Sequence, residues 1–348
     1  MVIKKLFFVF FLPIILFGIV TISASAQQAE INLTASPTSI DVVSPPGTTL
    51  SEKVRIRNNA DSPIQLKIEL KKLVADSTGQ ISVRDFQKGD DYQQWISIEN
   101  ATLSARPKEW TDIPFTITIP QTAAFSYYWA LMVSVESPKS QINTPQAKIT
   151  GSVAVPILLA IRKNGIIFSG RVDSFATDKG FYEYLPTNFL LTFQNSGNVH
   201  VKPRGNIFIT DWTGKQIDSI GINEAQGNVL PGSKRTFTST WDNGFITNEE
   251  KIEDGKVVTD SRGNPQTELK IHFDRLLAFR IGKYTATALV VVSGDKRDYS
   301  FEQTTSFFVF PWKIVLGTVI FVLLAGIGLA NTIKSLFRWI KKMLKKKE

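Results

Sequence analysis

LTFQNSGNVHVKPRGNIFITDWTGK occupies residues 191–215, and two interpretations of it lead to different proteins. An alternating apolar run ends at Asn195-Ser-Gly-Asn198, a second run follows, and Asp211-Trp-Thr-Gly-Lys215 closes the stretch. Asn, His, Asp and Gly could gather here as a chemical site. The same residue types are also favoured in tight turns between β-strands, because Gly and Asn tolerate a positive φ.

The stretch has a counterpart earlier in the chain, which favours the strand-and-turn interpretation. Four blocks recur in the same order: 54–66 corresponds to 191–201, 76–80 to 211–215, 106–118 to 230–240, and 127–135 to 283–292. Such repetition indicates two copies of one domain. We therefore expect an all-β ectodomain of two tandem Ig-like antiparallel β-sandwiches, over residues 28–162 and 163–310.

The second copy carries additional sequence near residues 243–282. Asp254-Gly255 and Gly263-Asn-Pro265 are turn signals on either side of a short apolar run. This pattern predicts an inserted hairpin. It could project and bind a partner, or it could be a longer ordinary connection.

Charge is concentrated at the two ends of the chain. The 348 residues carry a net charge of +9, of which the first 26 residues supply +2 and residues 313–348 supply +7. The body between them is neutral, whereas a nucleic-acid-binding protein places its positive charge on the folded part. We therefore expect no nucleic acid as a partner. The chain has no cysteine, which excludes disulfides and thiolate chemistry.

The two ends predict export and a membrane anchor. Residues 1–26 have two lysines, an apolar stretch and a final Ala-Ser-Ala, which is typical of a signal peptide, although an uncleaved anchor has a similar pattern. Residues 312–333 are long and apolar enough for one transmembrane helix, with Trp312 at its start. The basic residues that follow place the C-terminus in the cytoplasm and residues 27–311 outside the cell membrane.

Residues 334–348 form a short basic amphipathic tail, which we expect on the inner membrane surface. The residues expected at the membrane surface are Trp312, Lys334, Arg338, Lys341, Lys342, Lys345, Lys346 and Lys347. Lysine and arginine near an anionic surface each contribute about 1 kcal/mol. The alternative is a plain stop-transfer tail with no further role.

Signals of catalysis are weak. The chain has only two histidines, His200 and His272, without the local spacing of a zinc site or a serine hydrolase motif. We interpret both as surface or half-buried strand residues. Asp76-Ser-Thr-Gly79 and Asp211-Trp-Thr-Gly214 each contain one residue too many for an aspartic protease signature. We predict no catalytic residue, cofactor or metal ligand, although Asp- and Asn-rich turns leave calcium open.

Four aromatic residues are the candidate ligand-binding residues: Trp95, Tyr127, Tyr128 and Trp129. Aromatic rings can stack on sugars, but in a β-sandwich they more often fill the core. Both interpretations stay open at this point.

Residues 95–137 resemble the peptidoglycan-binding domain of the bacterial WxL-interacting protein family. The resemblance rests on a strand that begins at Trp95, a turn at Pro107, the strand Phe115-Thr-Ile-Thr-Ile-Pro120, and a strand with Tyr127 and Tyr128. It covers residues 30–162, and the second domain matches in outline. The resemblance implies a cell-surface scaffold that contacts the wall and other surface proteins.

The expected function is therefore non-catalytic. The main interpretation is a membrane-anchored surface scaffold or adhesion protein that binds cell-wall glycan or other surface proteins. The alternative is an extracytoplasmic assembly or export accessory that holds protein partners by exposed strand edges. An enzyme would instead be indicated by His200 or His272 within hydrogen-bond reach of both a carboxylate and a hydroxyl in a cleft.

Overall fold

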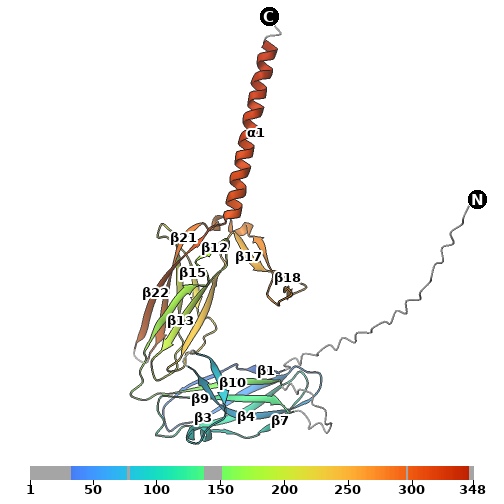
Figure 1. Ribbon diagram of the computed structural model, residues 1–348. Helices are drawn as coiled ribbons and strands as arrows, with labels where there is room; N and C mark the ends of the chain where they lie inside the picture. Colours follow the sequence, from blue (N-terminus) through green and yellow to red (C-terminus); the bar gives the residue numbers. More distant parts are fainter. Residues whose placement is uncertain (1–32, 77–78, 137–150, 295–296, 345–348) are drawn as a thin grey trace, which may run out of the picture.

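The computed structural model describes residues 33–76, 79–136, 151–294 and 297–344. The predicted signal peptide and the tail residues Lys345–Lys347 lie outside these ranges. Two β-structured units follow one another along the chain, and one long helix leaves the far end of the second unit (Figure 1). The first unit lies across the opposite end of the second.

The first unit is a sandwich of two sheets. One sheet has the order β1 (Leu33–Ser36), β3 (Thr49–Asn58), β8 (Trp110–Thr118) and β6 (Ile96–Ile98). The facing sheet has the order β2 (Ile40–Ser44), β10 (Ser152–Ile161), β9 (Ser126–Val135), β4 (Ile64–Ala75) and β5 (Ile81–Arg84), and β7 (Thr102–Ala105) also pairs with β4. A short 3-10 helix, η1 (Asp91–Trp95), leads into β6.

The second unit repeats this layering. One sheet contains β11 (Gly170–Thr177), β13 (Thr187–Asn195) and β16 (Lys234–Trp241). The other contains β12 (Phe181–Tyr182), β22 (Asp298–Val309), β21 (Gly282–Ser293), β14 (Arg204–Thr210) and β15 (Gln216–Ile222). Between β16 and β21 lie β17 (Ile246–Glu250), β18 (Ile252–Glu253), β19 (Lys256–Val257), β20 (Thr267–Ile271) and the 3-10 segment η2 (Phe273–Ala278).

Each sandwich has its own core, because alternate strand residues point inward. In β8 the inward residues Ile113, Phe115 and Ile117 are all buried. Trp129 lies fully buried in the first core, and Trp241 lies fully buried in the second. The two cores are separate clusters, so each sandwich buries enough apolar surface to form a unit of its own.

The stretch quoted at the start forms the end of β13, a turn, β14 and a second turn. Asn195 is fully buried, and its amide bonds to two backbone carbonyls and to the backbone N–H two residues later. Asn58 ends β3 and makes the same set of bonds in the first sandwich. The aligned asparagines are therefore structural residues that fix equivalent turns.

The strand pairing differs from the predicted antiparallel sandwiches at one edge of each unit. β2 runs parallel to β10, and β12 runs parallel to β22. In each unit the first strand, β1 or β11, pairs within one sheet. The chain then crosses to the other sheet, where β2 or β12 runs in the same direction as the last strand of the unit, β10 or β22. This crossing makes the last pair parallel, so the purely antiparallel prediction is wrong there.

The helix α1 (Trp312–Leu344) is 33 residues long and continues beyond the predicted boundary at residue 333. The part of α1 from Trp312 to Arg338 has a mean hydropathy of 2.3, and the rest of the protein buries none of it. It is therefore long and apolar enough to cross a membrane. No helix breaker occurs at Asn331-Thr332, and the Thr332 hydroxyl donates to backbone carbonyls one turn earlier. Residues 334–344 of the basic tail thus continue the same helix, with Lys334 and Arg338 on its exposed surface.

Candidate functional site

Three of the four predicted ligand-binding aromatics pack together inside the first sandwich. The Trp95 and Tyr127 rings lie 4.3 Å apart between centroids, and both rings contact Trp129. The Trp129 indole N–H donates to the Tyr92 carbonyl at 3.2 Å, and Trp129 is fully buried. Trp95 and Tyr127 are partly buried and pack against the same core, so the cluster has the contacts expected of core packing.

Tyr128 points away from this cluster toward the second sandwich. Its hydroxyl lies 3.4 Å from Nδ1 of His200, and the two rings meet edge to face. The opposite ring nitrogen of His200, Nε2, lies 2.9 Å from the Asp41 carboxylate in β2. The structure thus separates Tyr128 from the other three aromatics and places it at the contact between the two units.

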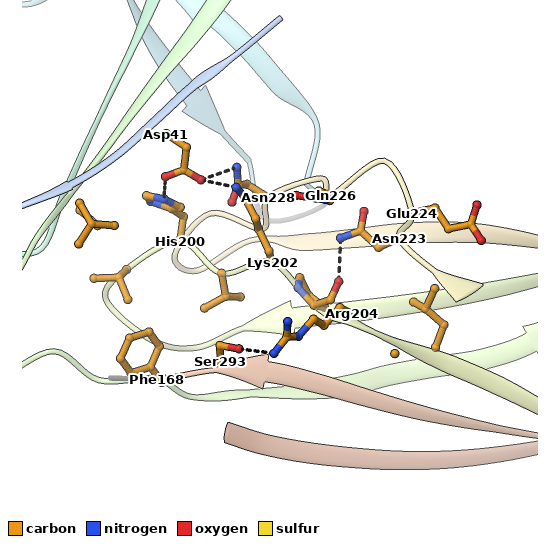
Figure 2. A pocket seen from close by; sticks show the side chains of 18 of the residues that line it. Asp41, Phe168, His200, Lys202, Arg204, Asn223, Glu224, Gln226, Asn228 and Ser293 are labelled. Carbon is orange, nitrogen blue, oxygen red and sulfur yellow. Dashed lines mark hydrogen bonds and ion pairs between the residues drawn. The ribbon is translucent and has the colours of Figure 1, made fainter. Parts of the chain in front are cut away.

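Asp41 is the centre of this contact. Besides His200, its carboxylate accepts a hydrogen bond from the Lys202 ammonium at 2.7 Å and a longer one from the Asn228 amide at 3.4 Å. We refer to Asp41, His200, Lys202 and Tyr128 as the interdomain clamp. Figure 2 shows Asp41 reaching across to His200, Lys202 and Asn228 of the second sandwich.

The electrostatics of the clamp favour an ionised Asp41. Burial alone would raise the pKa of Asp41, but hydrogen bonds from His200 and Lys202, together with their charge, lower that pKa well below its ordinary value. Burial raises the pKa of the Tyr128 phenol above its ordinary value, so this hydroxyl keeps its proton at physiological pH.

The turn at residues 195–198 supports the clamp. The Asn198 carbonyl accepts a hydrogen bond from the Ser126 hydroxyl of the first sandwich at 3.0 Å. The Asn198 side chain holds the connecting segment through the Gly165 carbonyl and the Ile167 N–H, both at 2.9 Å. This turn is therefore also part of the joint between the units.

A hollow of about 770 Å³ lies beside the clamp, between the two sandwiches. We refer to it as the interdomain cleft. Its residues come from β2 and the end of β10 on one side, and from the loops around β14 and β15 on the other. Three cations line it, Arg162, Lys202 and Arg204, and Arg204 is held by the Ser293 hydroxyl at 3.0 Å (Figure 2).

Two residues of the cleft lining lack the contacts that such side chains usually make in a folded protein. Val43 of β2 lines the cleft with 57 % of its surface exposed. The side-chain oxygen Oδ1 of Asn228 is buried without a hydrogen-bond partner, although buried polar atoms are nearly always paired. The cleft lining thus offers an apolar contact at Val43, whereas the unpaired Asn228 oxygen is closed to solvent.

Strand edges border the cleft. β2 pairs with β10 on one side, and no described strand pairs with its other side. β15 and β16 likewise each have one partner strand, and the groove of about 460 Å³ between them shares Gly221, Asn223 and Glu224 with the cleft. Main-chain groups for pairing with an added strand are therefore present at the cleft and along the groove.

Both histidines lie near a carboxylate and a hydroxyl, an arrangement that would indicate an enzyme if it opened into a cleft. At His272, Thr247 at 2.8 Å and Glu249 at 2.9 Å both contact Nε2, whereas a catalytic relay uses opposite ring nitrogens. Thr247 is also fully buried. At His200 the hydroxyl is the Tyr128 phenol, which does not line the cleft. Neither arrangement presents an accessible nucleophile.

The structure corrects the interpretation of His200 as a surface or half-buried strand residue. Its side chain is only 5 % exposed. Gln65, the aligned residue in the first sandwich, is exposed. His200 is covered by the other sandwich, and Asp41 is 159 residues away in the chain, so no local sequence signal marks either as part of a joint. Within the described ranges, no group of three or more His, Asp or Glu side chains is placed to hold a metal ion.

No family model matches the chain. No curated protein matches it in sequence.

Among the solved structures to which the chain is similar are several chaperones. The class 5 fimbriae chaperone CfaA has 14 % identity and a TM-score of 0.37, with 79 % of this chain and 99 % of that chain covered. The chaperone–tip subunit complex CsuC–CsuE of Acinetobacter baumannii has 10 % identity and a TM-score of 0.35, with 78 % and 97 % covered. The YadV chaperone has 10 % identity and a TM-score of 0.34, with 79 % and 100 % covered. Since every TM-score is below 0.5, the likeness by itself assigns no function to this chain.

Proposed function

We propose that this chain is a non-catalytic, membrane-anchored protein that holds an extended segment of another protein outside the cytoplasm. The observation that carries the proposal is the interdomain cleft, which is lined by Asp41 and Val43 of the edge strand β2. This is the assembly-accessory alternative of the sequence analysis. We favour it over a glycan-binding scaffold because Trp129 is fully buried, Trp95 and Tyr127 pack against the first core, and Tyr128 contacts His200 of the second sandwich.

An extended peptide fits this site for a physical reason. A strand added to β2 gains main-chain hydrogen bonds, and alternate side chains find apolar and polar contacts on either side. Val43 and Asp41 are two residues apart in β2, so their side chains share the face toward the cleft.

Charge selects among possible segments. The lining carries three cations, Arg162, Lys202 and Arg204, against two carboxylates, Asp41 and Glu224, so it has an excess of positive charge. Lys202 pairs with Asp41, and Arg204 has an exposed pair at 3.7 Å with Asp298, which lies outside the lining. We therefore propose that the segment carries acidic side chains, because guanidinium groups bind carboxylates by paired hydrogen bonds.

The rest of the chain serves to place this site. We propose that both sandwiches are of the immunoglobulin type, that α1 spans the cell membrane with its basic end in the cytoplasm, and that residues 27–311 lie outside. The first sandwich lies at the end of the second sandwich opposite to α1 (Figure 1), so the cleft between the two would be held away from the lipid. Wall glycan stays a prediction of the family resemblance, and retention of the full chain on purified wall sacculi would test it.

The test of the proposal is selection of peptides from a random displayed library on the full chain in lipid nanodiscs. Selected acidic peptides should bind the wild-type protein and lose affinity at least 10-fold with Val43→Glu, which places a charge at the β2 edge. Leu190→Glu is the matched control, because Leu190 is also an exposed apolar strand residue, in β13, and does not line the cleft. Equal binding to all three proteins, or recovery of no peptide, would refute the proposal.

A further inference from the structure

The end of the second sandwich from which α1 leaves is unusually apolar on its outside. β21 and β22 pair Gly282 with Val309, and α1 begins three residues after Val309, at Trp312. Whatever lies near Gly282 therefore lies at the root of the helix. Figure 1 shows the inserted strand β17 beside this root.

Two further segments reach the same place. The turn after β14 brings Trp212 next to Gly282, where a Cβ added to Gly282 would lie 3.5 Å from the indole ring. The η2 segment runs directly into Gly282, and its neighbour Phe279 lines the same small cavity as Pro311. The three segments are distant in sequence and meet around the start of α1.

Their side chains face solvent to an unusual degree. Leu277 is 101 % exposed, Trp212 75 % and Phe273 73 %, and Leu276, Phe279 and Trp312 are also exposed. We refer to these six residues as the apolar collar. Large apolar residues gathered on one surface of a soluble domain mark a contact with a protein or a membrane.

Continuity with α1 favours the membrane. Trp312 belongs both to the collar and to the apolar helical window of mean hydropathy 2.3, so a bilayer that surrounds the helix also meets the collar. Aromatic side chains are enriched where a protein crosses the membrane–water interface. Asp274 and Arg275 lie between Phe273 and Leu276 and pair with each other at 3.5 Å, so this interruption of the apolar residues is neutral overall. Arg280 turns inward, where it donates to the Asn243 carbonyl and lies over the Trp241 ring.

We propose that the apolar collar is embedded in the interfacial layer of the outer leaflet, with Leu277 entering the region of the upper acyl chains. This inference rests on the proposed membrane span. The second sandwich would then rest against the membrane surface instead of moving freely at the end of α1. This contact would also fix the orientation of the interdomain cleft relative to the membrane.

The absence of cysteine from the chain allows a direct test by site-specific labelling. Three single-cysteine variants of the full chain are labelled with an environment-sensitive fluorophore and reconstituted in phosphatidylcholine vesicles. Leu277→Cys reports on the collar. Val322→Cys lies ten residues into α1, about 15 Å along the helix, and Ser300→Cys lies on exposed β22. Quenching is measured with lipids that carry a nitroxide near the headgroup or deep in the acyl chain.

The expected result is strong quenching of the Leu277 label by the shallow nitroxide, with at least twofold weaker quenching by the deep one. The Val322 label should show the reverse order, and the Ser300 label should be quenched by neither. A Leu277 label that behaves like the Ser300 label, while Val322 is quenched, would overturn the collar and leave the membrane span intact. Self-quenching of Leu277 labels at high lipid-to-protein ratio would show that a second copy covers the collar, which would also overturn it. An unquenched Val322 label would refute the span itself.

Discussion

Substitution of Asp41 by Asn should loosen the joint between the two sandwiches without unfolding either. The Asp41 carboxylate accepts hydrogen bonds from His200 at 2.9 Å and from Lys202 at 2.7 Å. An Asn side chain has only one accepting oxygen, so its NH2 group would face either His200 or Lys202, which are themselves donors. A hydrogen bond to a charged group contributes about 1.5–3 kcal/mol, and an exposed pair such as that with Lys202 contributes about 0.5 kcal/mol. The clamp should therefore lose about 3 kcal/mol, which is roughly a 100-fold change in the ratio of closed to open joints.

Electron spin resonance can measure this change as a distance distribution between the units. Nitroxide labels at Val83→Cys in β5 and Leu289→Cys in β21 lie on exposed strand positions of different sandwiches. In the wild-type background the distribution should be narrow. In Asp41→Asn it should broaden or gain a second maximum, while the far-ultraviolet circular dichroism stays that of a β protein.

Asp173→Asn provides the matched control. Asp173 also accepts from two cations, Lys234 at 2.7 Å and Arg171 at 3.3 Å, but all three residues belong to the second sandwich. Its loss should leave the distance distribution unchanged. An unchanged distribution in Asp41→Asn, or an equal broadening in Asp173→Asn, would refute the assignment of the clamp as the joint.

Three other predictions concern Asn195, Trp129 and the pH dependence of the Asp41 contacts. Asn195→Ala removes three buried hydrogen bonds and should lower the free energy of unfolding of the second sandwich by about 3 kcal/mol in urea denaturation; a loss below about 1 kcal/mol would contradict its structural role. Trp129→Ala should destabilise the first sandwich by about 3–5 kcal/mol through the cavity it leaves, and a near-neutral effect would instead favour a ligand-binding role. Because Asp41 has a lowered pKa in the folded protein, its contribution is complete above its ordinary pKa of 3.8 and declines as the pH falls below it. The difference between wild type and Asp41→Asn should therefore shrink on acidification from pH 7 to pH 3, and a difference that grows would show the wrong sign.

The two-layer β architecture could be predicted because its signals are local. Alternation along β8 and β13 and the aligned turns at Asn58 and Asn195 are properties of neighbouring residues. The parallel pairing of β2 with β10 could not be predicted in this way. It arises where the chain crosses between sheets, and the crossing depends on the last strand, more than 100 residues later.

The candidate site was harder to predict, because its residues acquire their roles only from contact between the two units. Alternation places the His200 side chain outward from its own sandwich, as with Gln65 in the first. Its burial comes from Asp41 and Tyr128 of the first sandwich. The aromatic candidates differ among themselves: Trp129 and its neighbours Trp95 and Tyr127 pack against their own core, a choice that composition alone leaves open.

Hydrogen exchange on the full chain in nanodiscs, with and without a selected acidic peptide, tests the central claim most directly. An added strand protects the backbone amides that it pairs with. The account predicts slower exchange in β2 (Ile40–Ser44) and in the loop before β14 when the peptide is bound. Protection confined to other strands, or no change in β2 at saturating peptide, would contradict the claim that the cleft between the two sandwiches holds an extended partner.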